Sequence, residues 1–121
     1  MKVLVVDDSP TIRKILKNIL RKHGIEVEEA SGGNEGLQKL LKDKEIKLII
    51  SDLNMPEMSG IEFIKRAREA KPSIRVAILS TEEEKHLVKD VEIDAYFVKP
   101  PNIPEFVKKV KELLLSAEKA S

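Results

Sequence analysis

The sequence predicts a single α/β domain built on an open, five-stranded parallel sheet with helices on both faces. Short apolar runs alternate with amphipathic stretches of helical periodicity, which is typical of β–α–β units joined by right-handed crossovers. The apolar runs are mostly continuous Val, Ile and Leu, as expected when both faces of a sheet are covered. The chain has 121 residues, which is the usual size of one domain. We therefore expect one doubly wound domain over residues 1–121.

Five apolar runs are the predicted strands, and they cover residues 2–7, 25–30, 47–52, 74–80 and 95–99. For the strand order 2-1-3-4-5, the first and third strands are neighbours at the point where the order reverses. Between the strands, brief apolar stripes at three-and-four spacing predict a second and a third helix. These stripes are formed by Leu37, Leu40 and Leu41, and by Ile61, Ile64 and Ala67.

Capping signals define the first and last predicted helices. The first helix is expected to begin at Ser9 and Pro10 and to end at Gly24. Its apolar positions are Ile12, Ile15, Leu16, Ile19 and Leu20. The last helix is expected to begin at Asn102, with Glu105 at capping-box spacing, and the small polar tail from residue 116 is expected to fray. Its apolar positions are Phe106, Val107, Val110, Leu113 and Leu114.

The composition excludes several classes of function. The formal net charge is +1, so no basic field favours nucleic acid or an anionic membrane. The chain has no cysteine, which excludes disulfides, zinc–thiolate sites and thiol catalysis. No apolar run has the length of a membrane span and no signal peptide is recognisable, so a cytoplasmic protein is expected. Lys and Glu dominate the charged residues, which favours a thermophilic source.

Polar residues stand where four of the predicted strands end. They are Asp7 and Asp8 after the first strand, Asp52 at the third, Ser80 and Thr81 at the fourth, and Lys99 at the fifth. Open parallel sheets bind their ligands at the carboxyl ends of the strands. Because the first and third strands are expected to be neighbours, their three aspartates should lie close together.

Three carboxylates in one place are unfavourable unless a cation neutralises them. Mg²⁺ suits such a site, with Mn²⁺ as its substitute, because it accepts a few carboxylates and keeps waters that a phosphate can displace. Lys99 would supply a positive charge for a phosphoryl oxygen, and Ser80 would supply a hydroxyl donor. The remaining carboxylate can act as a nucleophile and form an acyl phosphate. An EF-hand is excluded, because Pro56 and Glu57 stand where that loop needs a ligand and then glycine.

The sequence resembles the receiver domain of two-component response regulators, especially the single-domain chemotaxis and phosphorelay kinds. The resemblance is carried by "VLVVDDSPTIRKIL", "LIISDLNMPEMSGIEFIK", the pair Ser80 and Thr81, and "AYFVKPP". These segments span nearly the whole chain in the family's order and spacing. The resemblance implies the flavodoxin-like fold.

The resemblance also implies a role for each residue of the expected site. Asp52 corresponds to the phosphoacceptor, and Asp7 and Asp8 correspond to the acidic pair that binds Mg²⁺. The backbone carbonyl of Asn54 corresponds to a further metal ligand. Lys99 corresponds to the lysine that contacts the phosphoryl group, and its peptide bond to Pro100 is expected to be cis.

Ser80 and Tyr96 fall where the family has its switch pair. In such proteins the hydroxyl moves toward the phosphoryl group and the aromatic ring turns inward behind it. Simpler interpretations stay open for both residues: Ser80 could merely end a strand, and Tyr96 could be an ordinary half-buried aromatic residue on an edge strand.

The sequence departs from the family pattern near the end of the chain. The segment between Ser80 and Lys99 is shorter than usual, so the helix within it is expected to be short or displaced. Thr81 replaces the usual small residue, and we expect its branched side chain to narrow access to Asp52. Pro101 stands where an aromatic residue often follows Lys-Pro.

The predicted function is a phosphorylation-controlled switch. A sensor histidine kinase or a phosphotransfer protein would donate the phosphoryl group to Asp52. The chain would then bind a downstream protein and slowly hydrolyse its own aspartyl phosphate, which makes it a signalling protein rather than a turnover enzyme. Neither nucleic acid nor membrane is an expected partner.

Two other functions stay open. A receiver-like module that binds proteins without phosphate is disfavoured by the complete set of Asp7, Asp8, Asp52 and Lys99. A Mg²⁺-dependent aspartyl phosphatase would need a second acid two residues after Asp52, where Asn54 stands.

Overall fold

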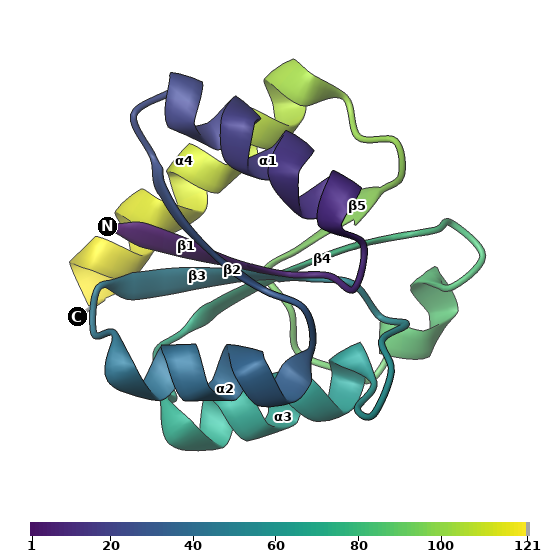
Figure 1. The fold of residues 1–121 in the computed structure, drawn as a ribbon. Helices are drawn as coiled ribbons and strands as arrows, with labels where there is room; N and C mark the ends of the chain where they lie inside the picture. Colours follow the sequence, from purple (N-terminus) through teal and green to yellow (C-terminus); the bar gives the residue numbers. More distant parts are fainter. Residues whose placement is uncertain (121) are drawn as a thin grey trace.

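The computed structural model describes residues 1–120, in which helices and strands alternate along the chain (Figure 1). The strands are β1 (Lys2–Val6), β2 (Glu26–Ala30), β3 (Ile46–Ser51), β4 (Arg75–Ser80) and β5 (Ala95–Val98). The α-helices are α1 (Pro10–Lys22), α2 (Gly33–Lys42), α3 (Gly60–Ala70) and α4 (Ile103–Ala120), and a 3₁₀ helix, η1, covers Lys85–Val88. Each predicted strand lies within about one residue of an observed strand.

The five strands form one parallel sheet in the order β2-β1-β3-β4-β5. This confirms the predicted fold class and places β1 beside β3. The register pairs Val6 with Ser51, so the residues that follow them, Asp7 and Asp52, leave the sheet at the same level. A backbone hydrogen bond of 3.0 Å from the Asp52 N–H to the Val6 carbonyl extends this alignment.

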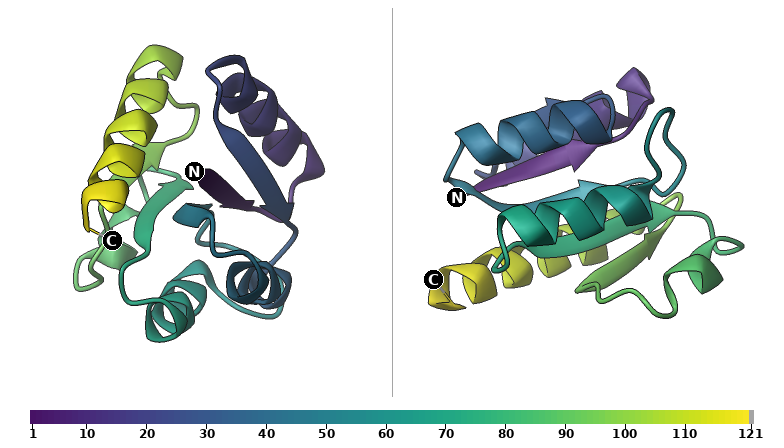
Figure 2. Two further views of the ribbon diagram at one scale, coloured as in Figure 1. Left: turned by 90° about the vertical axis from the view of Figure 1, so that its left-hand side faces the viewer. Right: turned by 90° about the horizontal axis from the view of Figure 1, so that it is seen from below.

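The sheet separates two apolar cores. Helices α1 and α4 cover one face, and α2 and α3 cover the other (Figures 1 and 2). Successive residues of a strand point to opposite faces, so Val3 and Val5 pack beneath α1 and α4 while Leu4 and Val6 pack beneath α2 and α3. All four are at most 1% exposed. Burial on both faces explains why the strands lack polar alternation.

The predicted capping residues set the helix ends. Ser9 Oγ accepts the Ile12 N–H at 3.3 Å, and Asn102 Oδ1 accepts the Glu105 N–H at 3.1 Å. Gly24 follows α1 with φ of 74°, a left-handed conformation that glycine adopts without a steric penalty. These caps fix where α1 and α4 begin, next to the carboxyl ends of β1 and β5.

The connection from β4 to β5 contains only the short helix η1, in agreement with the expectation of a short or displaced helix. Its apolar residues still contribute to the core on the α2 and α3 side: Val88 is buried, and Val91 and Ile93 pack against the same cluster. Three consecutive glutamates, residues 82–84, precede η1.

The last helix extends further than the sequence suggests. Where fraying is expected from residue 116, α4 continues to Ala120. Ala117 is 4% exposed and extends the apolar stripe of Leu113 and Leu114, and the Ser116 hydroxyl donates to the Leu113 carbonyl at 2.9 Å. The stripe therefore anchors another turn. Residue 121 lies outside the described residues.

Candidate functional site

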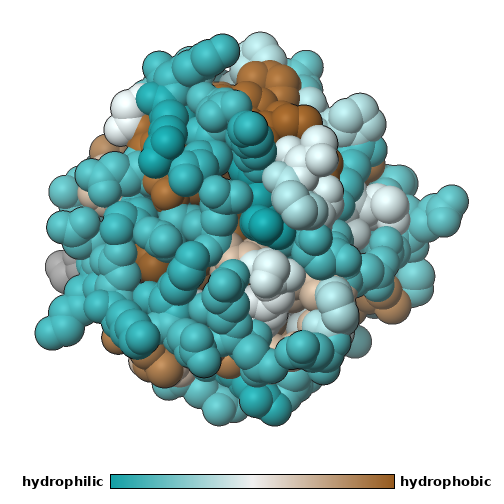
Figure 3. Space-filling view, in the orientation of Figure 1, coloured by the Kyte–Doolittle hydropathy of each residue, from teal (hydrophilic) through white to brown (hydrophobic). Residues whose placement is uncertain are grey.

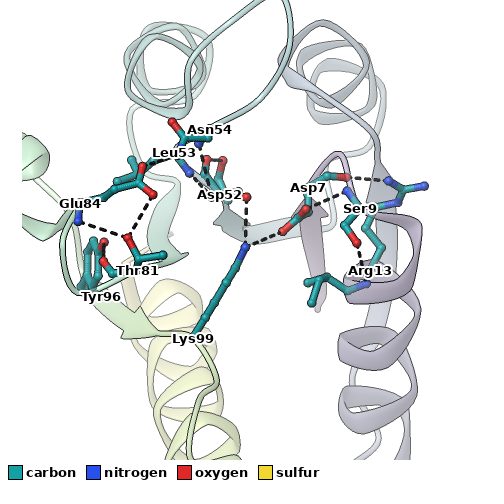
Figure 4. Close-up of polar contacts among 12 residues, drawn as sticks. Asp7, Ser9, Arg13, Asp52, Leu53, Asn54, Thr81, Glu84, Tyr96 and Lys99 are labelled. Carbon is teal, nitrogen blue, oxygen red and sulfur yellow. Dashed lines mark hydrogen bonds and ion pairs between the residues drawn. The ribbon is translucent and has the colours of Figure 1, made fainter.

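Lys99 joins two buried aspartates at the carboxyl edge of the sheet (Figure 4). Its Nζ atom lies 3.1 Å from Asp52 Oδ2 and 3.5 Å from Asp7 Oδ2. Asp7 is 3% exposed and Asp52 is 8% exposed. These residues directly follow β1, β3 and β5, so the expected convergence of strand ends is present in the structure.

The loop after β3 fixes the Asp52 carboxylate. Its Oδ1 accepts the backbone N–H of Leu53 at 2.7 Å and that of Asn54 at 3.3 Å, while Oδ2 faces Lys99. Gly60 at the start of α3 closes this loop, because its N–H donates to the Leu53 carbonyl at 2.9 Å. A Cβ atom at Gly60 would lie 2.1 Å from the Asp52 carbonyl oxygen. Glycine is therefore required for α3 to begin this close to Asp52.

The Asp7 carboxylate is fixed from the other side by α1. Its Oδ1 accepts the Ser9 N–H at 2.9 Å. The Arg13 guanidinium donates to the Asp7 backbone carbonyl at 2.6 Å and pairs with Glu29 on β2 at 3.3 Å. The turn between β1 and α1 is thus held in place, and Asp7 points toward Asp52.

Burial and neighbouring charges shift the pKa values of Asp7 and Lys99. Burial raises the pKa of Asp7 above its ordinary value, and the charge of Asp52 adds to that shift, although the Ser9 N–H and Lys99 oppose it. For Lys99, burial acts to lower the pKa, but the hydrogen bond to Asp52 and the charges of Asp7 and Asp52 outweigh it and raise the pKa. Lys99 therefore stays positively charged, while an ionised Asp7 is incompletely compensated.

Three carboxylates are close enough to share one cation. Asp7, Asp8 and Asp52 each offer an oxygen, and these atoms all lie within 4.8 Å of one another. Carboxylate oxygens are the ligands that Mg²⁺ prefers, and a site with one exposed ligand leaves room for waters or a phosphate. Asp8 is the exposed member. The donor set therefore fits Mg²⁺, and the incompletely compensated charge of Asp7 is a physical reason to bind it.

The comparison with known families agrees with this arrangement. The profile of the family described as the response regulator receiver domain matches residues 3–111. The chain belongs to this family. Membership of the receiver domains implies phosphorylation-dependent signalling in two-component systems, with histidine kinases and downstream targets as partners and Mg²⁺ at the acidic pocket.

Relatives of this receiver domain include chemotaxis proteins. It is 38% identical over 120 residues to a chemotaxis protein CheY homolog of Campylobacter jejuni, with 94% of this chain and 92% of the relative covered. Among solved structures, chemotaxis protein CheY4 of Vibrio cholerae superposes with a TM-score of 0.83 at 38% identity, covering 93% of this chain and 97% of that one. Response regulator TrrA of Thermotoga maritima, in complex with Mg²⁺ and BeF, gives a TM-score of 0.85 at 34% identity, with 93% and 97% covered.

Within residues 1–120, none of the helices combines the length and apolar character needed to cross a bilayer.

The residues predicted as a switch lie beside the acidic cluster. Ser80 is 1% exposed at the end of β4, and its backbone carbonyl accepts the Lys99 N–H at 2.8 Å. The Tyr96 hydroxyl donates to the Thr81 carbonyl at 2.6 Å, and Lys85 Nζ lies 5.9 Å from the Tyr96 ring centroid. Burial raises the pKa of Tyr96, so its hydroxyl remains a donor. Tyr96 thus holds the residue after Ser80, while a switching role for the pair stays a prediction.

Thr81 is exposed, and its hydroxyl is directed to Glu84 rather than free, with Oγ1 3.1 Å from Glu84 Oε1. Asn54 follows the Asp52 loop, and its side-chain amide also reaches Glu84. The Thr81 side chain is therefore held by Glu84. The proposed roles of Thr81 as an access gate and of the Asn54 carbonyl as a metal ligand stay predictions.

An apolar groove of about 540 Å³ adjoins the site on the side of α1. It lies between α1 and the segment that follows the cis Lys99–Pro100 peptide bond, a bond that confirms the prediction. Lys99 lines this groove and also contacts Asp52, so the groove and the acidic cluster share one wall. The space-filling view shows hydrophobic side chains on this α1 and α4 side of the molecule (Figure 3). The groove residues are Ile12, Ile15, Leu16, Ile19, Leu79, Lys99, Pro100, Pro101 and Ile103.

Three positioning residues were not predicted from the sequence. Arg13 stands one helical turn after the capping residue Ser9, but nothing in its spacing points to the Asp7 carbonyl. A glycine at the start of a helix, such as Gly60, suggests only that another part of the backbone approaches closely, and not which part. Glu84 is one of three adjacent glutamates. Its spacing from Thr81 is that of a capping box, but only the fold reveals its contact with Asn54.

Proposed function

We propose that this receiver domain accepts a phosphoryl group on Asp52 and signals through a protein partner. The observation that carries the proposal is the contact of Lys99 with Asp52 at 3.1 Å inside a cluster of three carboxylates. A buried carboxylate between a lysine and a cation site is oriented as a nucleophile, because both charges stabilise the added phosphoryl oxygens.

The proposed reaction is a transfer from a phosphohistidine. A carboxylate oxygen of Asp52 attacks phosphorus, the O–P bond forms as the N–P bond of the donor breaks, and the leaving imidazole takes a proton from solvent. Asp7, Asp8, Asp52 and the Asn54 carbonyl would hold Mg²⁺. When bound, Mg²⁺ supplies positive charge that neutralises the carboxylates and the phosphoryl oxygens.

The slow return reaction uses the same site. Water attacks phosphorus, the bond between phosphorus and Asp52 breaks, and inorganic phosphate leaves. Lys99 keeps its contact with a phosphoryl oxygen during both steps and reports the phosphorylated state to Ser80, to which it is bonded through its backbone N–H. The Tyr96 side chain would then break its hydrogen bond to the Thr81 carbonyl and turn inward.

The apolar groove along α1 supports a protein as the phosphoryl donor. Ile15 is 49% exposed and Ile103 is 39% exposed, which gives a donor helix or loop a nonpolar contact beside Lys99. A sensor histidine kinase or a phosphotransfer protein would present its phosphohistidine from that surface. A downstream protein would read the altered β4 and β5 region, and a cytoplasmic location forms part of this proposal.

The test is to incubate the protein with acetyl phosphate, with and without Mg²⁺, and to measure its intact mass. Wild type should gain the mass of one phosphoryl group only with Mg²⁺, and Asp52→Asn should gain none. A wild type that takes no phosphoryl group would instead support a phosphate-independent binding module. Release of phosphate from many donors per protein, without a detectable adduct, would indicate an aspartyl phosphatase.

A further inference from the structure

The Glu84 carboxylate bridges two loops beside Asp52 (Figure 4). Its Oε2 accepts the Asn54 side-chain amide at 2.5 Å, and its Oε1 accepts the Thr81 hydroxyl at 3.1 Å. The Glu84 N–H in turn donates to Thr81 Oγ1 at 3.3 Å. We call Asn54, Thr81 and Glu84 the Glu84 clamp.

The clamp connects the loop that follows β3 with the loop that follows β4. Asn54 lies two residues after Asp52 and donates its own N–H to Asp52 Oδ1. Thr81 directly follows Ser80, and Tyr96 holds the Thr81 carbonyl at 2.6 Å. Figure 4 places the clamp on the side of Asp52 that faces away from Asp7. The loops after β3 and β4 are therefore tied together along one wall of the site.

The clamp forms one wall of the approach to Asp52. Both Asp52 oxygens already have partners, and the side chain is only 8% exposed. Asp7 and Lys99 fill the opposite side, where the cation would also bind. The clamp also keeps a carboxylate at the wall, where it would repel anionic phosphoryl oxygens.

We propose that Glu84 is a positioning residue that controls access to Asp52. The clamp opens before a donor phosphoryl group or a water molecule reaches the reacting atoms, and it closes again between reactions. Because both steps need the open state, Glu84 slows phosphorylation and hydrolysis by the same factor. This inference rests on the proposed phosphorylation of Asp52.

An equal effect on both steps separates the clamp from simple charge repulsion. A negative charge near the site slows an anionic donor, but it does not slow a neutral water molecule to the same degree. The chain offers a matched control in Glu83, which is an exposed glutamate on the same loop. Removing Glu83 removes the same charge and leaves the clamp intact.

The experiment measures two rate constants for wild type, Glu84→Ala and Glu83→Ala: phosphorylation by acetyl phosphate with Mg²⁺, and decay of the phosphorylated protein after the donor is removed. Glu84→Ala should accelerate both by the same factor, roughly three- to tenfold, as expected for losing exposed side-chain hydrogen bonds. Glu83→Ala should change each by no more than about twofold. Glu84→Gln, which keeps a bridging group, should restore part of the wild-type rates.

A double mutant tests whether Glu84 acts through Asn54. In an Asn54→Ala background, Glu84→Ala should change the rates by much less than in wild type, because the link to the Asp52 loop is already gone. Full retention of the Glu84→Ala effect in that background would overturn the clamp. Three results for the Glu84→Ala single mutant would also overturn it: two unchanged rate constants, faster phosphorylation with unchanged hydrolysis, or slower hydrolysis. A wild type that takes no phosphoryl group would overturn the proposed function itself, and the clamp with it.

Discussion

Gly60 touches the backbone of Asp52 so closely that a Cβ atom on Gly60 would lie 2.1 Å from the Asp52 carbonyl oxygen and 2.8 Å from the Leu53 Cα. Both obstacles are backbone atoms, so no side-chain rotation can relieve them. The start of α3 therefore fixes the backbone that carries the proposed phosphoacceptor.

Gly60→Ala should destabilise the fold and displace Asp52. Overpacking of this kind costs about 1–3 kcal/mol, measured as the loss of unfolding free energy in urea. Gly32→Ala is the control, because a Cβ atom there would meet nothing within 4 Å. Equal stability of the two variants would show that the approach of α3 to Asp52 is not tight.

Asp7 should destabilise the metal-free protein near neutral pH. Its pKa is raised from 3.8 by burial and by Asp52, so the folded state binds a proton more tightly than the unfolded chain does. Stability is therefore highest below the unfolded pKa and is lost as the pH rises through the raised folded pKa. Metal-free Asp7→Asn should be more stable than wild type at pH 7, and urea titrations should show the difference shrinking toward pH 4. A difference that grows on acidification would contradict the sign.

Lys99→Ala should separate phosphorylation from switching. The substitution removes a charge that is 3.1 Å from Asp52, so labelling by acetyl phosphate should slow by roughly 100-fold but still occur. The labelled mutant should lack the amide chemical-shift changes that wild type shows around Ser80 and Tyr96. Identical shift changes in mutant and wild type would mean that Lys99 does not report the phosphoryl group.

Thr81→Ala should accelerate both labelling and hydrolysis, because it removes a branched side chain and one member of the Glu84 clamp. Thr81→Val distinguishes these two contributions, since valine keeps the shape and loses the hydroxyl that Glu84 binds. If the hydroxyl is what matters, Thr81→Val should behave like Thr81→Ala within about twofold. Wild-type rates in Thr81→Val would assign the effect to the shape of the side chain alone.

Much of the fold follows from local sequence patterns. Continuous apolar strands and the caps at Ser9 and Asn102 predict elements that the structure confirms. The proximity of Asp7 and Asp52 is predictable because parallel strands end at a common edge of the sheet. The C-terminal end of α4 is harder to predict from the sequence, because the burial of Ala117 depends on tertiary packing and the tail itself is polar.

The finer architecture of the site depends on loop conformation. Asp52 and Lys99 carry chemical signals in their residue types and positions. Glu84 stands three residues after Thr81 on the same loop, but its contact with Asn54 arises only when two loops that are 30 residues apart fold against each other. The same holds for Gly60, whose necessity appears only once the distance to the Asp52 carbonyl is known.

The central claim is that Asp7, Asp8 and Asp52 share one cation at the place where Asp52 reacts. Thermal unfolding of wild type and Asp52→Asn over a Mg²⁺ titration tests it most directly. We expect metal-free Asp52→Asn to melt higher than wild type, because one of three like charges is gone. Mg²⁺ at 100 times its dissociation constant should stabilise wild type by about 2.7 kcal/mol and the mutant by less, so that the melting temperatures converge. A mutant that melts lower without metal and gains as much from Mg²⁺ as wild type would show that the three carboxylates do not form one site.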